Sequence, residues 1–223
     1  MERLKGKNYI HLMKKNSITQ ATYNKVAQQY WEKVASLDHY NASYDTFCEL
    51  LSQDAKVFEM GCGPGNVTQY VLNNRPDLQY TASDLAPSML ALAKKHNTNV
   101  QFLQLDCREI VTLNQKFDAI IGAFVLPYLN KTECATLICD CAKALTPKGV
   151  LYLSTMEGDY AQSGFEHTSF SGEDQVYIHY HQEAFLRECL SENDFEVLHL
   201  IKQACHEPDG RVYNDMIFIV RKL

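Results

Sequence analysis

The sequence has no long hydrophobic run, no excess of basic residues and only one tryptophan among its 223 residues. Its longest apolar stretch, Ala119 to Leu126 with its flanks, is far shorter than the roughly 20 residues that a membrane-spanning helix needs. The basic N-terminus has no apolar run ending in small residues, so it is not typical of a signal peptide. We therefore expect no membrane association and a cytoplasmic protein.

Acidic residues outnumber basic ones, 27 to 21, so the net charge is -6 and the isoelectric point is about 5.7. Proteins that grip nucleic acid through its phosphates usually carry a clear basic excess, so no nucleic-acid partner is expected. The hydrophobic fraction of 46% suffices for one continuous core. These bounds favour a small-molecule partner and leave the oligomeric state open.

Eight cysteines are dispersed through segments that are typical of helices and strands, in a chain too long to need disulfide staples. We expect reduced thiols that are mostly buried. The one cluster, Cys134, Cys139 and Cys141, has offsets of five and two, which spread around a helix instead of converging on one point. No metal site is predicted there.

The N-terminal quarter predicts two helices, over 16–37 and 41–51, and Ser17 with Gln20 fits a capping box for the first. Short apolar runs then alternate with amphipathic stretches, which indicates a doubly wound α/β core around a mostly parallel sheet. We expect a helical cap over 1–53 and a Rossmann-like core over 54–223, with a lid or substrate insertion at 157–178, all in one structural domain. The expected strands are 55–60, 78–83, 99–105, 117–125, 149–156, 176–181, 195–201 and 215–220, and the expected helices between them are 65–74, 86–96, 131–145 and 182–193.

The segment "VFEMGCGPGN" ends the first expected strand with Glu59 and then places Gly61, Gly63 and Gly65 at alternate positions. Ligands of open parallel sheets bind at the carboxyl ends of the strands, and glycines let the backbone turn sharply beside them. A dinucleotide fingerprint requires a further glycine at the position of Asn66, and Glu59 would repel a pyrophosphate. The segment therefore favours a ligand with a cationic centre.

Two more acids end the next two expected strands. Asp84, 19 residues after Gly65, can accept both hydroxyls of a ribose, although it is equally suited to begin the helix near Pro87. Asp106 can accept a hydrogen bond from the exocyclic amine of a purine, beside the free backbone of Cys107. A phosphate-free ligand with an amine, a ribose diol and an adenine would use all three acids.

The segments "VFEMGCGPGN", "SDLAPSMLALA", "LQLDCREI", "FDAIIGAFVLPYL" and "AKALTPKGVLYLS" together resemble the class I S-adenosylmethionine-dependent methyltransferases over about 55–155. Upstream, "TYNKVAQQYW" is similar to the helix that closes over the cofactor in the small-molecule branch of that family. The resemblance implies a seven-stranded sheet with an antiparallel last strand, supplied by "DMIFIV", and S-adenosylmethionine (SAM) as the cofactor. It implies cofactor contacts by Tyr23, Tyr30, Glu59, Gly61, Cys62, Gly63, Gly65, Asp84, Leu85, Met89, Asp106, Cys107 and Phe124.

Methyl transfer from a sulfonium requires alignment and exclusion of water, and a general base only when the nucleophile arrives protonated. The run "VYIHYH" sets His179 and His181 on one side of an expected strand with Tyr177, so either histidine is a candidate base or simply a surface residue. Tyr128 is a candidate substrate contact or a packing residue, and the same alternative holds for Tyr23 and Tyr30.

The segment 157–175 carries five acids and no lysine or arginine, which favours an amine-bearing acceptor if the segment covers the site. We thus expect a methyltransferase that acts on an oxygen or nitrogen of a small molecule. Two alternatives stay open: an NAD(P)-dependent oxidoreductase of Rossmann type, and a regulatory protein that binds SAM without catalysis.

Overall fold

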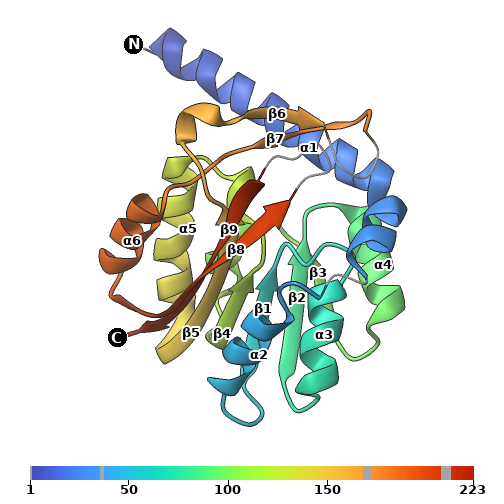
Figure 1. Cartoon of the computed structure of the whole chain (residues 1–223), viewed down its shortest axis with the longest axis vertical. Coiled ribbons are helices and arrows are strands. Elements are labelled where there is room, and N and C mark those ends of the chain that lie inside the picture. The colour runs from blue at the N-terminus through green and yellow to red at the C-terminus, as the bar shows by residue number, and fades with distance from the viewer. Residues whose placement is uncertain (1, 36–37, 168–171, 207–211) are drawn as a thin grey trace.

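The computed structural model describes residues 2–35, 38–167, 172–206 and 212–223. Its centre is a seven-stranded sheet in the order β3-β2-β1-β4-β5-β9-β8, which confirms the expected α/β fold (Figure 1). Within the described residues, we find no helix that combines the length and the apolar character needed to cross a membrane.

Strands β1 to β5 of this sheet are parallel, and β9 lies antiparallel between β5 and β8. The central strands are mostly buried because helices cover both of their faces. The expected antiparallel last strand is therefore confirmed. The strands are β1 (Lys56–Met60), β2 (Gln79–Asp84), β3 (Gln101–Gln104), β4 (Phe117–Gly122), β5 (Leu145–Met156), β8 (Phe195–His206) and β9 (Val212–Lys222).

The helices divide between the two faces of the sheet. Tyr44, Val71 and Leu90, from α2, α3 and α4, belong to the buried cluster on one face. Ile138 and Leu190, from α5 and α6, belong to the cluster on the other face. The helix bounds are α2 (Asn41–Glu49), α3 (Asn66–Asn74), α4 (Pro87–His96), α5 (Lys131–Ala144) and α6 (Glu183–Ser191).

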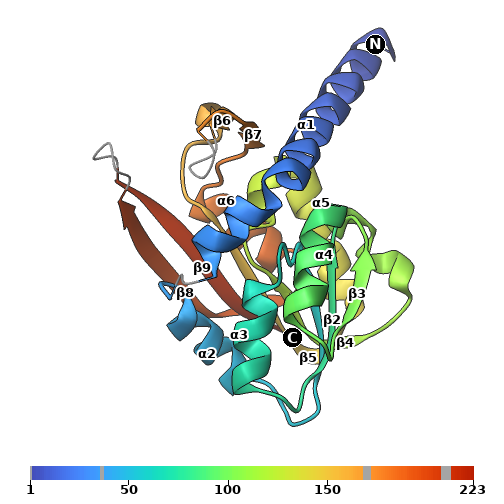
Figure 2. The ribbon, with the colours of Figure 1, turned by 90° about the vertical axis from the view of Figure 1, so that its right-hand side faces the viewer.

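The first helix, α1 (Glu2–Val34), is longer than expected. It begins 14 residues before Asn16, so Ser17 lies inside the helix and the predicted capping box is wrong. The segment contains no proline, and the single Gly6 costs only about 1 kcal/mol in a helix interior. Position 37, the expected end, lies outside the described residues. The helix passes over the sheet, and its N-terminal end extends beyond the rest of the chain (Figure 2).

The segment after β5 contains a small hairpin, of which the sequence predicted only the second strand, at 176–181. A short helix, η3 (Tyr160–Gln162), precedes β6 (Gly164–His167), which pairs antiparallel with β7 (Gln175–Ile178). This hairpin lies beside α1 over the carboxyl ends of the strands (Figure 1). Of the expected insertion at 157–178, residues 168–171 lie outside the described part, and its role as a lid stays a prediction.

All eight cysteines are free, and five of them are buried. Among the described residues, no group of three or more histidine, cysteine, aspartate or glutamate side chains could hold a metal ion.

Candidate functional site

A cavity of about 170 Å³ lies at the carboxyl ends of the parallel strands. The strand order reverses between β1 and β4, and open α/β sheets bind ligands at such a reversal. Two short helices border the cavity, η1 (Cys107–Leu113) and η2 (Leu126–Tyr128). The cavity is lined by Asn16, Thr19, Gln20, Tyr23, Tyr30, Gly61, Gly63, Asp84, Leu85, Ala86, Met89, Leu105, Asp106, Cys107, Arg108, Ala123, Phe124, Val125, Tyr128, Leu129, Tyr177 and His179.

The turn after β1 depends on glycine for its shape. Gly61, Gly63 and Gly65 all have positive φ angles, of 61°, 54° and 86°. A Cβ at Gly61 would lie 2.8 Å from Cγ2 of Val125, and one at Gly65 would lie 2.5 Å from Nδ2 of Asn97. Side chains at these positions would be both strained and blocked, so the loop can pass close to a ligand only with glycine.

Asp84 joins the glycine turn to the start of α4. Its Oδ2 accepts a hydrogen bond from the amide of Gly63 at 2.9 Å, and its Oδ1 accepts one from the amide of Ala86 at 2.8 Å. Burial raises the pKa of this carboxyl, while the two backbone amides oppose the rise. Each oxygen has a second lone-pair site, so the carboxylate at the cavity wall can still receive the two hydroxyls of a diol.

Asp106 faces a guanidinium that the sequence did not point to. It begins η1 and accepts hydrogen bonds from Nε and the amide of Arg108, at 2.9 and 3.0 Å. These contacts hold the pKa of Asp106 below its usual value although burial opposes them. Arg108 also pairs with Glu133 at 2.7 Å, and burial raises the pKa of the neighbouring Cys107 thiol.

Glu59 lies behind the turn, and it does not line the cavity. Its side chain is 1% exposed, and its Oε2 accepts hydrogen bonds from the hydroxyls of Thr68 at 2.5 Å and Tyr80 at 3.0 Å. Burial raises the pKa of Glu59 to about 7, although both hydroxyls lower it. The carboxyl group thus connects β1 to β2 and α3, and the predicted contact with a ligand would have to be indirect.

Three tyrosines meet where α1 crosses the cavity. The hydroxyl groups of Tyr23 and Tyr128 share a hydrogen bond, and the ring of Tyr23 lies edge-on to those of Tyr30 and Tyr128, each at 5.6 Å between centroids. Burial raises the pKa of all three hydroxyls, to about 12 for Tyr30. They are neutral groups that can donate or accept hydrogen bonds at the cavity wall.

Phe124 borders the same cavity just after β4. It has a positive φ of 55°, and its amide donates to Oγ of Ser154 at 2.9 Å. Its ring packs against Tyr40 at 5.2 Å, and the hydroxyl of Tyr40 donates to the buried Asp215 at 2.5 Å. The unusual backbone of Phe124 is therefore supported from the sheet and from the segment before α2.

The two histidines have different surroundings. His179 lines the cavity, and burial with nearby positive charge lowers its pKa to about 4. His181 is fully buried and does not line the cavity, and its Nε2 lies 3.1 Å from the carbonyl oxygens of both Leu126 and Leu129. His181 is thus fixed as a donor to backbone, while His179 presents a neutral imidazole at pH 7.

The structure brings most of the predicted site residues to one cavity. Four of them stand outside its lining: Glu59, Cys62, Gly65 and His181. Sequence reasoning missed Arg108 and the residues of α1 at 16, 19 and 20. No local pattern reveals the pairing of Arg108 with Glu133, because 25 residues separate them. The roles of the predicted site residues toward a ligand stay predictions.

Residues 57–149 match the sequence model of a family described as Methyltransferase domain. A malonyl-[acyl-carrier protein] O-methyltransferase from Acetivibrio thermocellus is 32% identical over 133 residues, which cover 57% of this chain and 43% of that protein. A trans-aconitate 2-methyltransferase from Methylobacterium nodulans is 33% identical over 103 residues, covering 45% and 38%. The chain spans less than half the length of these curated relatives.

The fold is similar to that of solved structures across almost the whole chain. One of them is magnesium protoporphyrin IX methyltransferase from Synechocystis PCC 6803, solved with bound SAM. The two structures align over 94% of this chain and 97% of that chain, with a TM-score of 0.68 and 16% sequence identity. The resemblance implied by the sequence segments is confirmed. Residues 57–149 thus match a methyltransferase domain, and the seven-stranded sheet around them has the fold of solved S-adenosylmethionine-dependent methyltransferases.

Proposed function

We propose that the protein transfers a methyl group from SAM to an oxygen or nitrogen of a small molecule. The observation that carries this proposal is the position of Asp84 and the glycine turn on one cavity at the reversal of the strand order. In the cavity, the carboxylate of Asp84 can accept hydrogen bonds from a diol, and the glycine turn beside it has no side chains that would block a ligand. An adenosyl ligand without phosphates uses both.

The residues present fit this cofactor. Gly61 and Gly63 would hold its methionine part, Asp84 its ribose hydroxyls, and Leu85 with Met89 its adenine ring. Asp106 and Cys107 would face the adenine edge, where Arg108 already neutralises the carboxylate. When bound, SAM supplies a methyl group on a positively charged sulfur, which leaves as a neutral thioether.

The chain itself would orient the acceptor and exclude water. Tyr23 and Tyr128 join α1 to η2 across the cavity, and Gln20 of α1 donates to the carbonyl of Leu85 at 3.0 Å. These contacts close α1 over the cavity at the strand ends. Orientation of reactants in such a closed site can contribute roughly 7 to 11 kcal/mol to a transfer reaction.

The names of the two curated relatives describe an O-methyltransferase and a methyltransferase of trans-aconitate, which supports an oxygen acceptor. An amine-bearing acceptor was expected from the acids of 157–175. That expectation has little support in the geometry, since none of these acids lines the cavity.

Isothermal titration with S-adenosylhomocysteine (SAH) and with NAD tests the cofactor. We expect SAH to bind and NAD to give no heat, because Asn66 stands where a dinucleotide fingerprint requires the glycine that lets a pyrophosphate approach the helix. Preferential binding of NAD would instead favour the oxidoreductase.

A screen of metabolite extracts with labelled-methyl SAM then tests catalysis. Transfer of label to a small molecule supports the enzyme. Tight binding of SAH without transfer to any pool would favour the regulatory alternative.

A further inference from the structure

The end of the cavity beneath α1 is aromatic and carries no acid. Tyr23 and Tyr128 come from α1 and η2, while Tyr177 and His179 come from β7 and the residues after it. The other lining groups from α1 are the neutral side chains at positions 16, 19, 20 and 30. The two carboxylates that line the cavity, those of Asp84 and Asp106, belong to the strand ends and already have donors.

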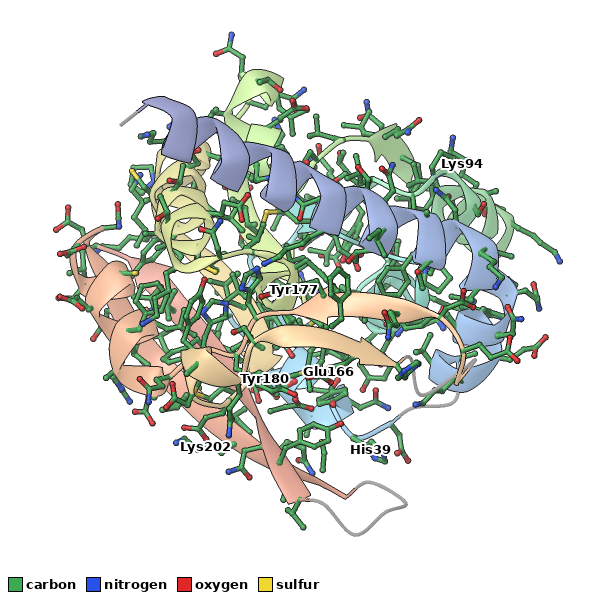
Figure 3. All side chains as sticks on the ribbon, turned by 90° about the horizontal axis from the view of Figure 1, so that it is seen from above. His39, Lys94, Glu166, Tyr177, Tyr180 and Lys202 are labelled. Atoms are coloured by element: carbon green, nitrogen blue, oxygen red, sulfur yellow. The ribbon has the colours of Figure 1, made fainter. Side chains whose placement is uncertain are left out.

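The acids of the segment after β5 point elsewhere. Glu157 pairs with Lys202 at 2.7 Å, and Asp174 pairs with Lys25 at 2.8 Å. Glu166 accepts a hydrogen bond from the hydroxyl of Tyr180 at 2.6 Å, on the side of the hairpin away from α1 (Figure 3). These three acids are therefore already paired, and none of the five acids of the segment lines the cavity.

Lys15 is not itself a lining residue, but its ammonium group lies against the wall at this end of the cavity. Its Nζ lies 3.7 Å from the ring centroid of Tyr177, one of the lining residues, and Figure 3 shows Tyr177 on the side of the hairpin that faces α1. No ion pair joins Lys15 to a carboxylate of the described residues, in contrast to Lys25 further along α1. An ammonium group over an aromatic wall, without an anion of its own, attracts a negatively charged ligand.

His179 is suited to a nucleophile that arrives without a proton. Its ring stacks on Tyr160 at 5.6 Å and lies tilted against Tyr177 at 4.9 Å, and its Nδ1 is buried without a hydrogen-bond partner in the described structure. Burial, His181 and Lys15 together keep its pKa near 4, so it is a weak base at pH 7. Amines and phenols would arrive protonated at that pH, whereas a carboxylic acid is already ionised.

Given the methyltransferase activity proposed above, we propose that the acceptor is a small aromatic or conjugated carboxylic acid and that Lys15 selects it by charge. An oxygen of the carboxylate forms the new bond to the methyl carbon. The bond from that carbon to sulfur breaks, and its electron pair remains on sulfur. A negative acceptor and a positive donor thus give a neutral methyl ester and a neutral thioether, and no proton is released or taken up.

Binding to the SAH-saturated protein tests the charge preference without turnover. The probes are benzoate and trans-aconitate, with benzamide and benzylamine as matched neutral and cationic analogues of benzoate. We expect both acids to bind and the analogues to bind at least tenfold more weakly, because an ammonium group and a neutral imidazole favour the anion. Tighter binding of benzylamine, or no binding of either acid, would overturn the proposal.

Variants of Lys15 locate the effect. Lys15→Glu should weaken acid binding by about tenfold or more, and Lys15→Arg should largely preserve it. Lys25→Met, which removes a cation already paired with Asp174, is the matched control and should leave acid binding unchanged. Unchanged SAH affinity in each variant verifies the fold. Equal acid affinity in the wild type and in Lys15→Glu would refute the role of Lys15.

Counting protons during transfer provides an independent readout. Labelled methyl transfer is followed in weak buffer with an indicator dye, for whichever acceptor the protein methylates. A carboxylate gives no proton per methyl group, whereas methylation of an ammonium group or a phenol releases one. One proton per methyl would exclude the carboxylate. Failure of SAH to bind would contradict the proposed methyltransferase function itself, which keeps the two hypotheses separable.

Discussion

Asp84 acts both as a structural residue and as the candidate ribose acceptor. Its two oxygens hold the amides of Gly63 and Ala86, so the same side chain fixes the glycine turn and the entry to α4. Because a carboxylate has about four acceptor sites, two backbone donors leave room for a ligand.

We predict that Asp84→Ala weakens SAH binding by about 1.5 to 3 kcal/mol, or roughly 10-fold to 150-fold. The loss arises because charge-assisted hydrogen bonds to the ribose diol disappear. Asp84→Asn, which keeps one acceptor, should lose less. Titration calorimetry measures the change, with the exposed Glu109→Ala as the control. An unaltered affinity in Asp84→Ala would place the ribose elsewhere.

Glu59 gives a pH-dependent prediction. Its pKa is about 7 in the folded protein against 4.5 as the ordinary value, so the folded state holds a proton that the unfolded state releases between these limits. The free energy of unfolding therefore falls as pH rises from 4.5 to 7. Glutamine has no charge to bury, so Glu59→Gln should gain about 2 to 3 kcal/mol relative to wild type between pH 4.5 and 8.

Urea unfolding of both proteins at pH 4.5 and pH 8 measures this gain. Glu109→Gln, at an exposed acid, should show no pH-dependent difference from wild type. A constant difference between Glu59→Gln and wild type at the two values would mean that the carboxyl titrates normally in the fold.

At the scale of elements, α1 closes the cavity through contacts with separate parts of the chain. Asn24 accepts a hydrogen bond from the amide of Ser88 at 3.0 Å, at the start of α4. Thr19 accepts one from the amide of Tyr177, and Thr22 donates to the carbonyl of Gln175, so β7 is held as well. The helix thus connects the start of α4 to the hairpin.

Deletion of residues 1–37 should abolish methyl transfer and accelerate SAH release, since water would then enter the cavity. Stopped-flow dissociation of SAH and labelled transfer to the acceptor found in the screen measure the two effects. Deletion of residues 1–14 is the matched control, because every lining residue of α1 lies at or after Asn16. Full transfer activity without residues 1–37 would refute the role of α1 as a lid.

At the scale of the whole molecule, the cavity connects elements that span most of the chain. Its lining runs from Asn16 to His179 and includes the ends of β1, β2, β3 and β4. A ligand that binds here therefore stabilises the folded chain as a unit and has no counterpart site in the unfolded chain.

SAH at 100 times its dissociation constant should add about 2.7 kcal/mol to the free energy of unfolding. For a chain of this size, that corresponds to a rise in melting temperature of about 5 to 11 °C. NAD at the same concentration should give no shift. Thermal unfolding with each ligand measures both, and an equal shift with NAD would contradict a site for a phosphate-free adenosyl ligand.

The sequence by itself determined the sheet and much of the cofactor end. The apolar runs, the glycines at alternate positions and the acids at strand ends are local patterns, because each involves only residues that are close together in the sequence. Because parallel strands bring their carboxyl ends to one edge, Gly63, Asp84 and Asp106 had to lie near one another once the alternation was recognised.

Only the tertiary structure decided which of these groups reach the cavity and what charge the acceptor meets. Glu59 ends the same strand as the glycine turn, yet Thr68 and Tyr80 hold it out of the cavity. Two of the acids after β5, Glu157 and Asp174, pair with lysines from β8 and α1, whereas Lys15 lies over the aromatic wall without such a pair. Such pairings join residues far apart in the chain, and charge is neutralised by neighbours in space rather than in sequence.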